Sequence, residues 1–321
     1  MSLFHPTGPR VGSLLSGSIR QAAMTVARRD HGTPSESDGA PASTVVEART
    51  SGPSAAPSLG PSFRSSEVIR VEHLAVSYRR SDGAEVRAVE DVSFSVREGE
   101  FVTLIGPSGC GKTSLLRVMG GLLRPAAGQV YVNDVLVKGP MPDAIAYVFQ
   151  DFALFPWRTA RANVEIALQL KRVPRGERRR RALDALDMVG LAEVADRFPR
   201  ELSGGMQQRL AVARALVSNC GILLLDEPFG ALDEQTRLVL GVQLSQLLES
   251  AGRTIVFVTH SLQEAVFLSD RILVLSHQPC RIKKTVEVPL PRPRGPDQVK
   301  SPAGQRIEAE LFQLLYRESL V

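Results

Sequence analysis

A short apolar run, Phe101-Val-Thr-Leu-Ile105, leads directly into Gly106-Pro-Ser-Gly-Cys-Gly-Lys112-Thr113, and a helical pattern follows to about Met119. Five mostly apolar residues bounded by glycine are typical of a buried strand. The next eight residues match G-x-x-x-x-G-K-[ST], the pattern in which a strand passes through a glycine-rich loop into a helix. The stretch therefore predicts strand, loop and helix in that order.

The residue types in this loop point to phosphate binding. Glycines let the backbone N–H groups approach phosphate oxygens at a helix N-terminus. Lys112 adds a positive charge for the β- and γ-phosphates, and the Thr113 hydroxyl is a magnesium ligand. A plain glycine-rich turn is the simplest alternative. A dinucleotide fingerprint has a different glycine spacing and no lysine after the last glycine. The loop thus predicts a nucleoside triphosphate site.

A second strand ends in two acids. Ile222-Leu-Leu-Leu225 is followed by Asp226-Glu227-Pro228. Ligands of open α/β sheets bind at the carboxyl ends of strands. There Asp226 can hold a magnesium shell, while Glu227 can take a proton from an attacking water. The alternative is a strand that ends in two solvated acids.

Composition excludes several classes of protein. The chain of 321 residues is 43% hydrophobic and has no run of about 18 apolar residues, as a membrane span needs. Three cysteines are too few for a disulfide scaffold, and no histidines stand at metal-ligand spacing. A net charge of +5 does not favour nucleic acid as a partner. The one dense basic cluster fits a solvated loop and helix face, or a surface near an anionic membrane leaflet: Lys171, Arg172, Arg175 and Arg178 to Arg181.

The first 65 residues contain 12 Ser, 7 Gly and 7 Pro. Such a segment buries too little apolar surface to offset its ordering entropy, so we expect residues 1–65 to be a disordered extension. Four arginines without an acid in the first 29 residues faintly resemble a transit peptide. A further alternative is that the start of the sequence was assigned too far upstream.

Beyond this extension, short apolar runs alternate with helical patterns, which indicates an α/β fold with a mainly parallel sheet. Alternating residues at Val68–Tyr78 and Val92–Val96 predict an antiparallel β layer. A helical subdomain is expected at about residues 158–218, and a C-terminal tail, 286–321, with a short helix at Ile307–Tyr316. The other predicted elements are strands at Ala144–Phe149, Thr254–Val258 and Ile272–Leu275 and helices at Ala162–Leu170, Arg178–Met188, Met206–Val217, Thr236–Glu249 and Leu262–Phe267.

Leu202-Ser-Gly-Gly-Met-Gln-Gln-Arg209 narrows the kind of nucleotide protein. By itself the segment could be a capped helix start. It resembles, however, the signature motif of ATP-binding cassette (ABC) ATPases. The family's other motifs stand in the expected order: Gln150 after a strand, Gly230-Ala-Leu-Asp233 after the acids, and Thr259-His-Ser261 after the next strand. The resemblance spans about residues 68–280 and implies a P-loop NTPase core over residues 66–285.

The resemblance implies roles for individual residues. Glu227 is the expected general base, with His260 at the γ-phosphate and Gln150 as a sensor of magnesium and water. The expected magnesium ligands are Thr113, Gln150 and Asp226. The expected ATP contacts are Tyr78, stacked on adenine, and Gly106, Pro107, Ser108, Gly109, Cys110, Gly111, Lys112, Thr113, Ser114, Ser203, Gly204, Gly205 and Asp233. Cys110 is also a candidate for oxidation, because a helix N-terminus lowers the pKa of a thiol.

The resemblance also implies partners. In this family the signature serine of one copy faces the nucleotide of another, so a homodimer with two ATP molecules is expected. Without a membrane span, a transport role needs two permease subunits and, for import, an extracytoplasmic solute-binding protein, with this chain on the cytoplasmic face of the membrane. Leu154-Phe-Pro-Trp157 and Pro291-Arg-Pro-Arg294 resemble the importer branch for nitrate, sulfonates and taurine. Packing of Trp157 under the helices, a soluble ABC ATPase and an exporter motor are the alternatives.

Overall fold

The computed structural model describes residues 66–319 apart from 82, 234, 238, 243–245, 247–251 and 293. The extension expected at residues 1–65 lies outside this part of the chain. Of the helices described, none combines the length and the apolar composition that crossing a membrane requires.

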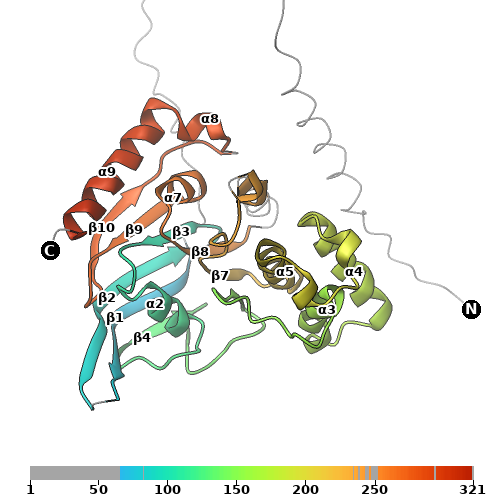
Figure 1. Ribbon diagram of the computed structural model, residues 1–321. Helices are drawn as coiled ribbons and strands as arrows, with labels where there is room; N and C mark the ends of the chain where they lie inside the picture. Colours follow the sequence, from blue (N-terminus) through green and yellow to red (C-terminus); the bar gives the residue numbers. More distant parts are fainter. Residues whose placement is uncertain are drawn as a thin grey trace, which may run out of the picture. The chain divides into compact units, whose positions relative to one another are not determined.

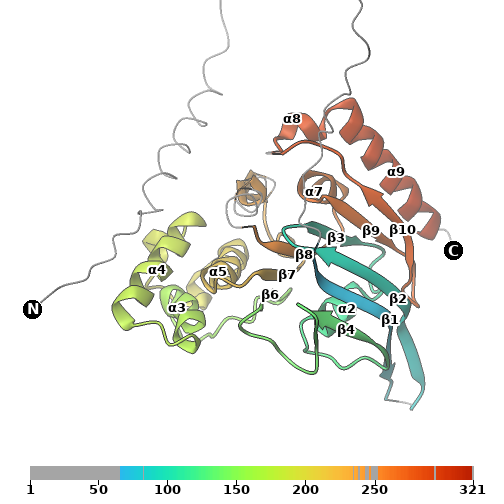
Figure 2. The same ribbon diagram turned by 180° about the vertical axis from the view of Figure 1, so that it is seen from behind.

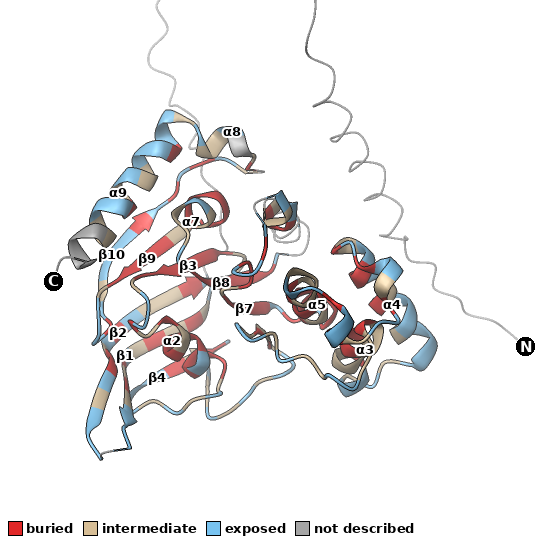
Figure 3. Ribbon diagram, in the orientation of Figure 1, coloured by how far each residue is buried: buried red, intermediate tan, exposed pale blue. Residues whose placement is uncertain are grey.

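A six-stranded sheet forms the centre of the fold, in the order β10-β9-β3-β8-β7-β6 (Figures 1 and 2). Its three middle strands are β3 (Phe101–Ile105), β8 (Thr254–Thr259) and β7 (Ile222–Asp226), and every residue in them is buried (Figure 3). Neighbouring strands pair in parallel except β9 with β10. The flanking strands are β6 (Ile145–Val148), β9 (Arg271–Leu275) and β10 (Ile282–Glu287). The expected mainly parallel sheet is confirmed.

A second, antiparallel sheet has the order β2-β1-β4-β5. It comprises β1 (Glu67–Arg79), β2 (Glu85–Arg97), β4 (Ala127–Val132) and β5 (Val135–Leu136). Helix α2 (Lys112–Met119) contributes Leu115 and Leu116 to a core shared with strands of both sheets. The sequence predicted the first two strands but missed β4, because its first three residues are exposed and show no alternation.

Three helices, α3 (Ala160–Leu170), α4 (Arg175–Met188) and α5 (Gly204–Val217), pack around a second core (Figure 2). They begin within two to three residues of the positions that the apolar pattern predicted. Thr159 and Ser203 cap α3 and α5, since their side chains accept hydrogen bonds from backbone N–H groups of the first turn.

The chain after β9 is more ordered than its prolines suggested. It forms β10, α8 (Pro296–Val299) and α9 (Pro302–Ser319), so the helix expected at Ile307–Tyr316 is longer than predicted. Leu311 of α9 is fully buried in a third core with α7 (Leu262–Leu268). Residues 236, 237, 239–242 and 246, inside the helix expected at Thr236–Glu249, are also helical, as is residue 235 just before it.

Arg292 and Arg294 attach this C-terminal part to the central sheet. Arg294 is 2% exposed and donates hydrogen bonds to the carbonyls of Leu290 and Val288. Arg292 Nε donates to Asp270 Oδ1 at 3.0 Å, and Asp270 Oδ2 accepts from Phe101 N at 2.9 Å. The two arginines therefore pack inside the fold instead of lying in a solvated linker.

Candidate functional site

The glycine-rich loop follows β3 and bends sharply before α2. Gly111 has φ +126°, and a Cβ there would stand 2.9 Å from the carbonyl oxygen of Ala88, so only glycine fits. Lys112 is 6% exposed, and its Nζ donates to the carbonyls of Gly106 and Pro107, both at 2.8 Å. The loop thus folds around a buried positive charge.

Two oxygen-bearing side chains meet beside this loop. Thr113 Oγ1 donates to Asp226 Oδ1 at 3.0 Å, and the Tyr147 hydroxyl lies 3.4 Å from Asp226 Oδ2. Burial raises the pKa of Asp226, and the nearby charge of Glu227 adds to this effect. The pair brings hard oxygen donors to the end of β7.

Glu227 has an unusual backbone. Its φ of +47° lies in the left-handed region, which is costly for a residue other than glycine and common at functional sites. Its N–H donates to the Val258 carbonyl at 3.0 Å, and its own carbonyl accepts from Gln208 Nε2 at 3.0 Å. Gln208 Oε1 in turn accepts from Ala231 N at 2.9 Å. The side-chain amide of Gln208 therefore connects the backbone of Glu227 to that of Ala231 and so fixes the turn after β7.

Sequence reasoning missed Gln208, although it lies inside the quoted signature segment. A glutamine in the first turns of a helix is ordinarily exposed to solvent. Here it is 2% exposed and connects α5 to the backbone of Glu227. Only the tertiary contact shows this role.

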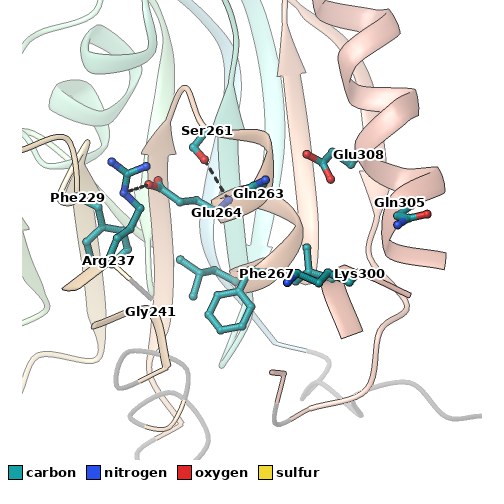
Figure 4. Close-up of a pocket in the computed structure, with 12 residues that line it drawn as sticks. Phe229, Arg237, Gly241, Ser261, Gln263, Glu264, Phe267, Lys300, Gln305 and Glu308 are labelled. Carbon is teal, nitrogen blue, oxygen red and sulfur yellow. Dashed lines mark hydrogen bonds and ion pairs between the residues drawn. The ribbon is translucent and has the colours of Figure 1, made fainter. Parts of the chain in front are cut away.

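His260 lies next to Glu227, with 3.4 Å between Nδ1 and Oε2. The preceding Thr259 Oγ1 donates to Glu264 Oε2 at 2.5 Å, and Glu264 Oε1 lies 3.3 Å from Arg237 Nε (Figure 4). Burial raises the pKa of Glu264. Behind this network is a cavity of about 490 Å³ between α7 and the C-terminal helices. The Glu264–Arg237 ion pair is therefore linked through Thr259 to the segment that carries His260.

The signature segment lies elsewhere. Ser203 and Gly204 are exposed at the start of α5, and Ser203 Oγ accepts from Met206 N at 3.3 Å. In Figures 1 and 2, α5 and α2 stand apart on either side of β7. Gly205 packs against the turn after β7, where a Cβ would lie 3.4 Å from Ala231 O. Ser203 therefore does not face the glycine-rich loop of its own chain.

Three further predicted residues lie around these two regions. Tyr78 is 40% exposed and shares a hydrogen bond of 2.8 Å with Ser114 Oγ, beside the loop. Gln150 is exposed just after β6. Asp233 is exposed and accepts from Thr236 N at 2.9 Å, and this bond lowers the pKa of Asp233. Neither Asp233 nor Gln150 contacts the loop through a hydrogen bond in the described part of the chain.

Trp157 is 71% exposed, with its ring centroid 5.7 Å from that of Phe155. The alternative that it packs under the helices is therefore wrong. The segment before it is firmly attached, since Arg214 donates hydrogen bonds to the carbonyls of Phe152 and Ala153. A large aromatic side chain is thus presented to solvent on an anchored loop.

Comparison with known proteins agrees with this geometry. The ABC transporter family matches residues 89–230. An ABC transporter ATP-binding protein of Methanocaldococcus jannaschii, MJ0412, is 46% identical over 226 residues, which are 70% of this chain and 84% of the relative. The chain belongs to the ABC transporter ATP-binding family. Like its relatives, this ABC protein is an ATP hydrolase.

Other relatives of the ABC subunit carry transport names. The nitrate import ATP-binding protein NrtC of Synechococcus elongatus is 41% identical, over 78% of this chain but 38% of the relative. The nitrate import ATP-binding protein NrtD of the same organism is 40% identical, over 72% and 85%. Among solved structures, a dimeric post-hydrolysis state of the ATP-binding cassette MJ0796 with ADP and Pi has a TM-score of 0.65 at 34% identity, covering 68% of this chain and 98% of that one.

Proposed function

We propose that this subunit holds ATP along the carboxyl edge of β3, β7 and β8. The observation that carries the proposal is the gathering there of one buried cation, two oxygen donors, a carboxylate and a histidine: Lys112, Thr113, Asp226, Glu227 and His260. The loop amides and Lys112 bind the phosphates. Tyr78 stacks on the adenine from its half-exposed position beside Ser114.

The donor set at Thr113 and Asp226 fits magnesium, which prefers oxygen ligands and keeps several waters. Gln150 completes the protein's share of the ligands. When bound, the cation neutralises charge on the phosphate oxygens. Glu227 accepts the proton of the attacking water, and His260, 3.4 Å away, orients that carboxylate.

The exposed signature supports a composite site between two copies. Ser203 and the amides of Gly204 and Gly205 form an anion-binding helix start that points away from the chain's own loop. A second copy, placed head to tail, brings its bound γ-phosphate to this helix start. The solved dimer of the relative MJ0796 supports such an arrangement.

The transport role rests on the relatives and on Trp157. Relatives of about 40% identity are named for nitrate import and for bicarbonate transport. We therefore propose a motor for import of a small anion, working with two permease subunits and an extracytoplasmic solute-binding protein at the cytoplasmic face of the membrane. The exposed Trp157 provides an apolar anchor for a permease helix.

Affinity purification of the full chain from mild-detergent extracts of its own membranes tests this role. We expect two copies of the chain with an integral membrane permease, and ATPase activity that rises when the solute-binding protein and its anion are added. Recovery with ribosomes or nucleic acid, and stimulation of the ATPase by RNA or DNA, would contradict it. A permease that lacks any solute-binding protein would instead indicate export.

A further inference from the structure

Arg237 connects two segments behind the histidine of the site. Its Nη2 donates to the Leu232 carbonyl at 3.2 Å, and its backbone N–H donates to the Asp233 carbonyl at 2.9 Å. Its Nε lies 3.3 Å from Glu264 Oε1 on α7 (Figure 4). Asp233 itself is exposed. One arginine therefore joins an exposed turn after β7 to the helix that follows His260.

The other carboxylate oxygen of Glu264 fixes the turn around His260. Thr259 Oγ1 donates to Glu264 Oε2 at 2.5 Å and accepts from Ser261 N at 3.0 Å. Because a carboxylate only accepts hydrogen bonds, the threonine hydroxyl has to donate to it, and this leaves the hydroxyl lone pairs for Ser261. His260 stands between these two residues, with its Nδ1 3.4 Å from Glu227 Oε2. The backbone that aims the histidine thus depends on an ionised Glu264.

The charge of Arg237 supports that ionised state. The Glu264 side chain is 11% exposed, so water screens the pair only in part. Burial raises the pKa of Glu264, and the hydrogen bond from Thr259 and the charge of Arg237 oppose this rise. Without the arginine the carboxyl is protonated more readily, and the threonine hydroxyl is no longer required to donate.

We propose that Arg237 and Glu264 are positioning residues that couple contact with a second copy at Asp233 to ATP hydrolysis. This role rests on the proposed function, in which two copies share each nucleotide and Glu227 is the base. A displacement of the Asp233 turn is carried by the guanidinium of Arg237 to Glu264. The threonine before His260 passes it to the histidine, which orients Glu227.

Steady-state ATPase of the full chain tests this role with Glu264→Gln, which keeps the size of the side chain but removes its charge. We expect kcat to fall about 10-fold, because the base is less well oriented, and KM for ATP to stay within about twofold. Glu165→Gln is the matched control, since Glu165 pairs with Arg161 at 3.0 Å on α3 and is 20% exposed. Its kcat should be unchanged. Wild-type kcat in Glu264→Gln, or equal losses in both variants, would overturn the proposal.

A double-mutant cycle separates coupling from local support. If contact at Asp233 acts through Glu264, Asp233→Ala and Glu264→Gln remove the same effect. The double variant should then lose about as much kcat as the more severe single variant. Losses that multiply would show that the two residues act independently, and they would overturn the proposal.

Arg237 provides a second variant in case Glu264→Gln does not fold. Arg237→Ala should lose kcat about 10-fold, and Arg237→Lys, which keeps the charge, should retain most of it. Wild-type kcat in Arg237→Ala, or equal losses with alanine and lysine, would overturn the proposal. Glu227→Gln, measured alongside, tests the proposed function separately. Near-normal turnover there removes the base, whereas an inactive Glu227→Gln beside an unaffected Glu264→Gln removes only the positioning role.

Discussion

The phosphate loop (Gly106–Thr113) and the signature tip (Ser203–Gly205, at the start of α5) both place glycines at a helix start. They differ in how many of a site's partners the same chain supplies. Lys112 is buried and bonded to two loop carbonyls, and Thr113 is bonded to Asp226 within the same chain. Ser203 is exposed, and within residues 66–319 as described its hydroxyl bonds to its own helix alone. The loop is a site that one chain completes, whereas the tip is half of a site. Substitutions at the loop should therefore act on ATP binding or chemistry in one copy, and those at the tip only on turnover by two.

The largest effect is expected at the base. Glu227→Gln keeps the shape and the hydrogen bonds of the backbone but cannot accept a proton, so ATP turnover should fall about 10²- to 10⁴-fold. ATP affinity, measured by fluorescent nucleotide titration, should stay within a few-fold of wild type. Near-normal hydrolysis would refute the assignment of Glu227.

The second-largest effect is expected when the positive charge of Lys112 is removed from the loop. Lys112→Ala deletes a charged hydrogen-bond donor to the phosphates, which is expected to weaken ATP binding by about 10- to 100-fold. Isothermal titration with the single chain measures this without any need for dimer formation. Unchanged affinity would show that the loop does not hold the phosphates.

The tip should behave differently. Ser203→Ala removes a helix cap, worth about 0.5–2 kcal/mol of stability, and a γ-phosphate contact of the partner copy. Turnover should fall about tenfold, the equivalent of one lost hydrogen bond of about 1.4 kcal/mol, while ATP affinity of the single chain is unchanged. Thr159→Ala is the matched control, because it removes the equivalent cap of α3 with the same 3.3 Å bond. Equal loss of turnover in both variants would reduce Ser203 to a cap.

Asp226 offers a smaller effect of opposite sign. Its pKa is raised in the folded state, so the carboxylate costs stability at neutral pH, and this cost disappears as pH falls through its raised pKa. Asp226→Asn should raise the melting temperature of the nucleotide-free protein at pH 7, by less at pH 5, and should weaken the binding of ATP with magnesium. Asp233→Asn should instead lower the melting temperature slightly, since the pKa of Asp233 is lowered. A pH-independent gain at Asp226 would contradict this explanation.

The smallest effect on the subunit is expected at Trp157. Trp157→Ala removes a ring that is 71% exposed, so stability should change by no more than about 0.5 kcal/mol and basal ATPase should be unchanged. Permease recovery in the affinity purification should nevertheless fall. Leu170→Ala, at the other end of α3 and 76% exposed, is the control and should retain the permease. Equal recovery with both variants would remove Trp157 from the docking surface.

The sequence predicts this fold correctly where the local pattern of apolar residues directly reflects how a segment is buried. Strands β3, β7 and β8 are buried on both faces, so they are mostly apolar runs, and their ends locate Lys112, Asp226 and His260. Strand β10, Ile282–Glu287, was missed because its exposed lysines blunt an edge strand and hide its alternation. The burial of Gln208 and Arg294 was missed as well, because it depends on segments distant in sequence: Gln208 bonds to Glu227, and Arg294 bonds to the carbonyls of Val266 and Ser269.

The composite site is tested most directly by crosslinking between copies. Ser108 of the loop and Ser203 are both exposed, whereas the three native cysteines are buried, so cysteines introduced at these two positions react first. Chains with Ser108→Cys and chains with Ser203→Cys, both also Glu227→Gln, are mixed with ATP, magnesium and a short thiol crosslinker. Two copies sharing each nucleotide predict a linked pair of chains only in the mixture and only with ATP. A link that forms solely within one polypeptide carrying both cysteines would contradict the shared site.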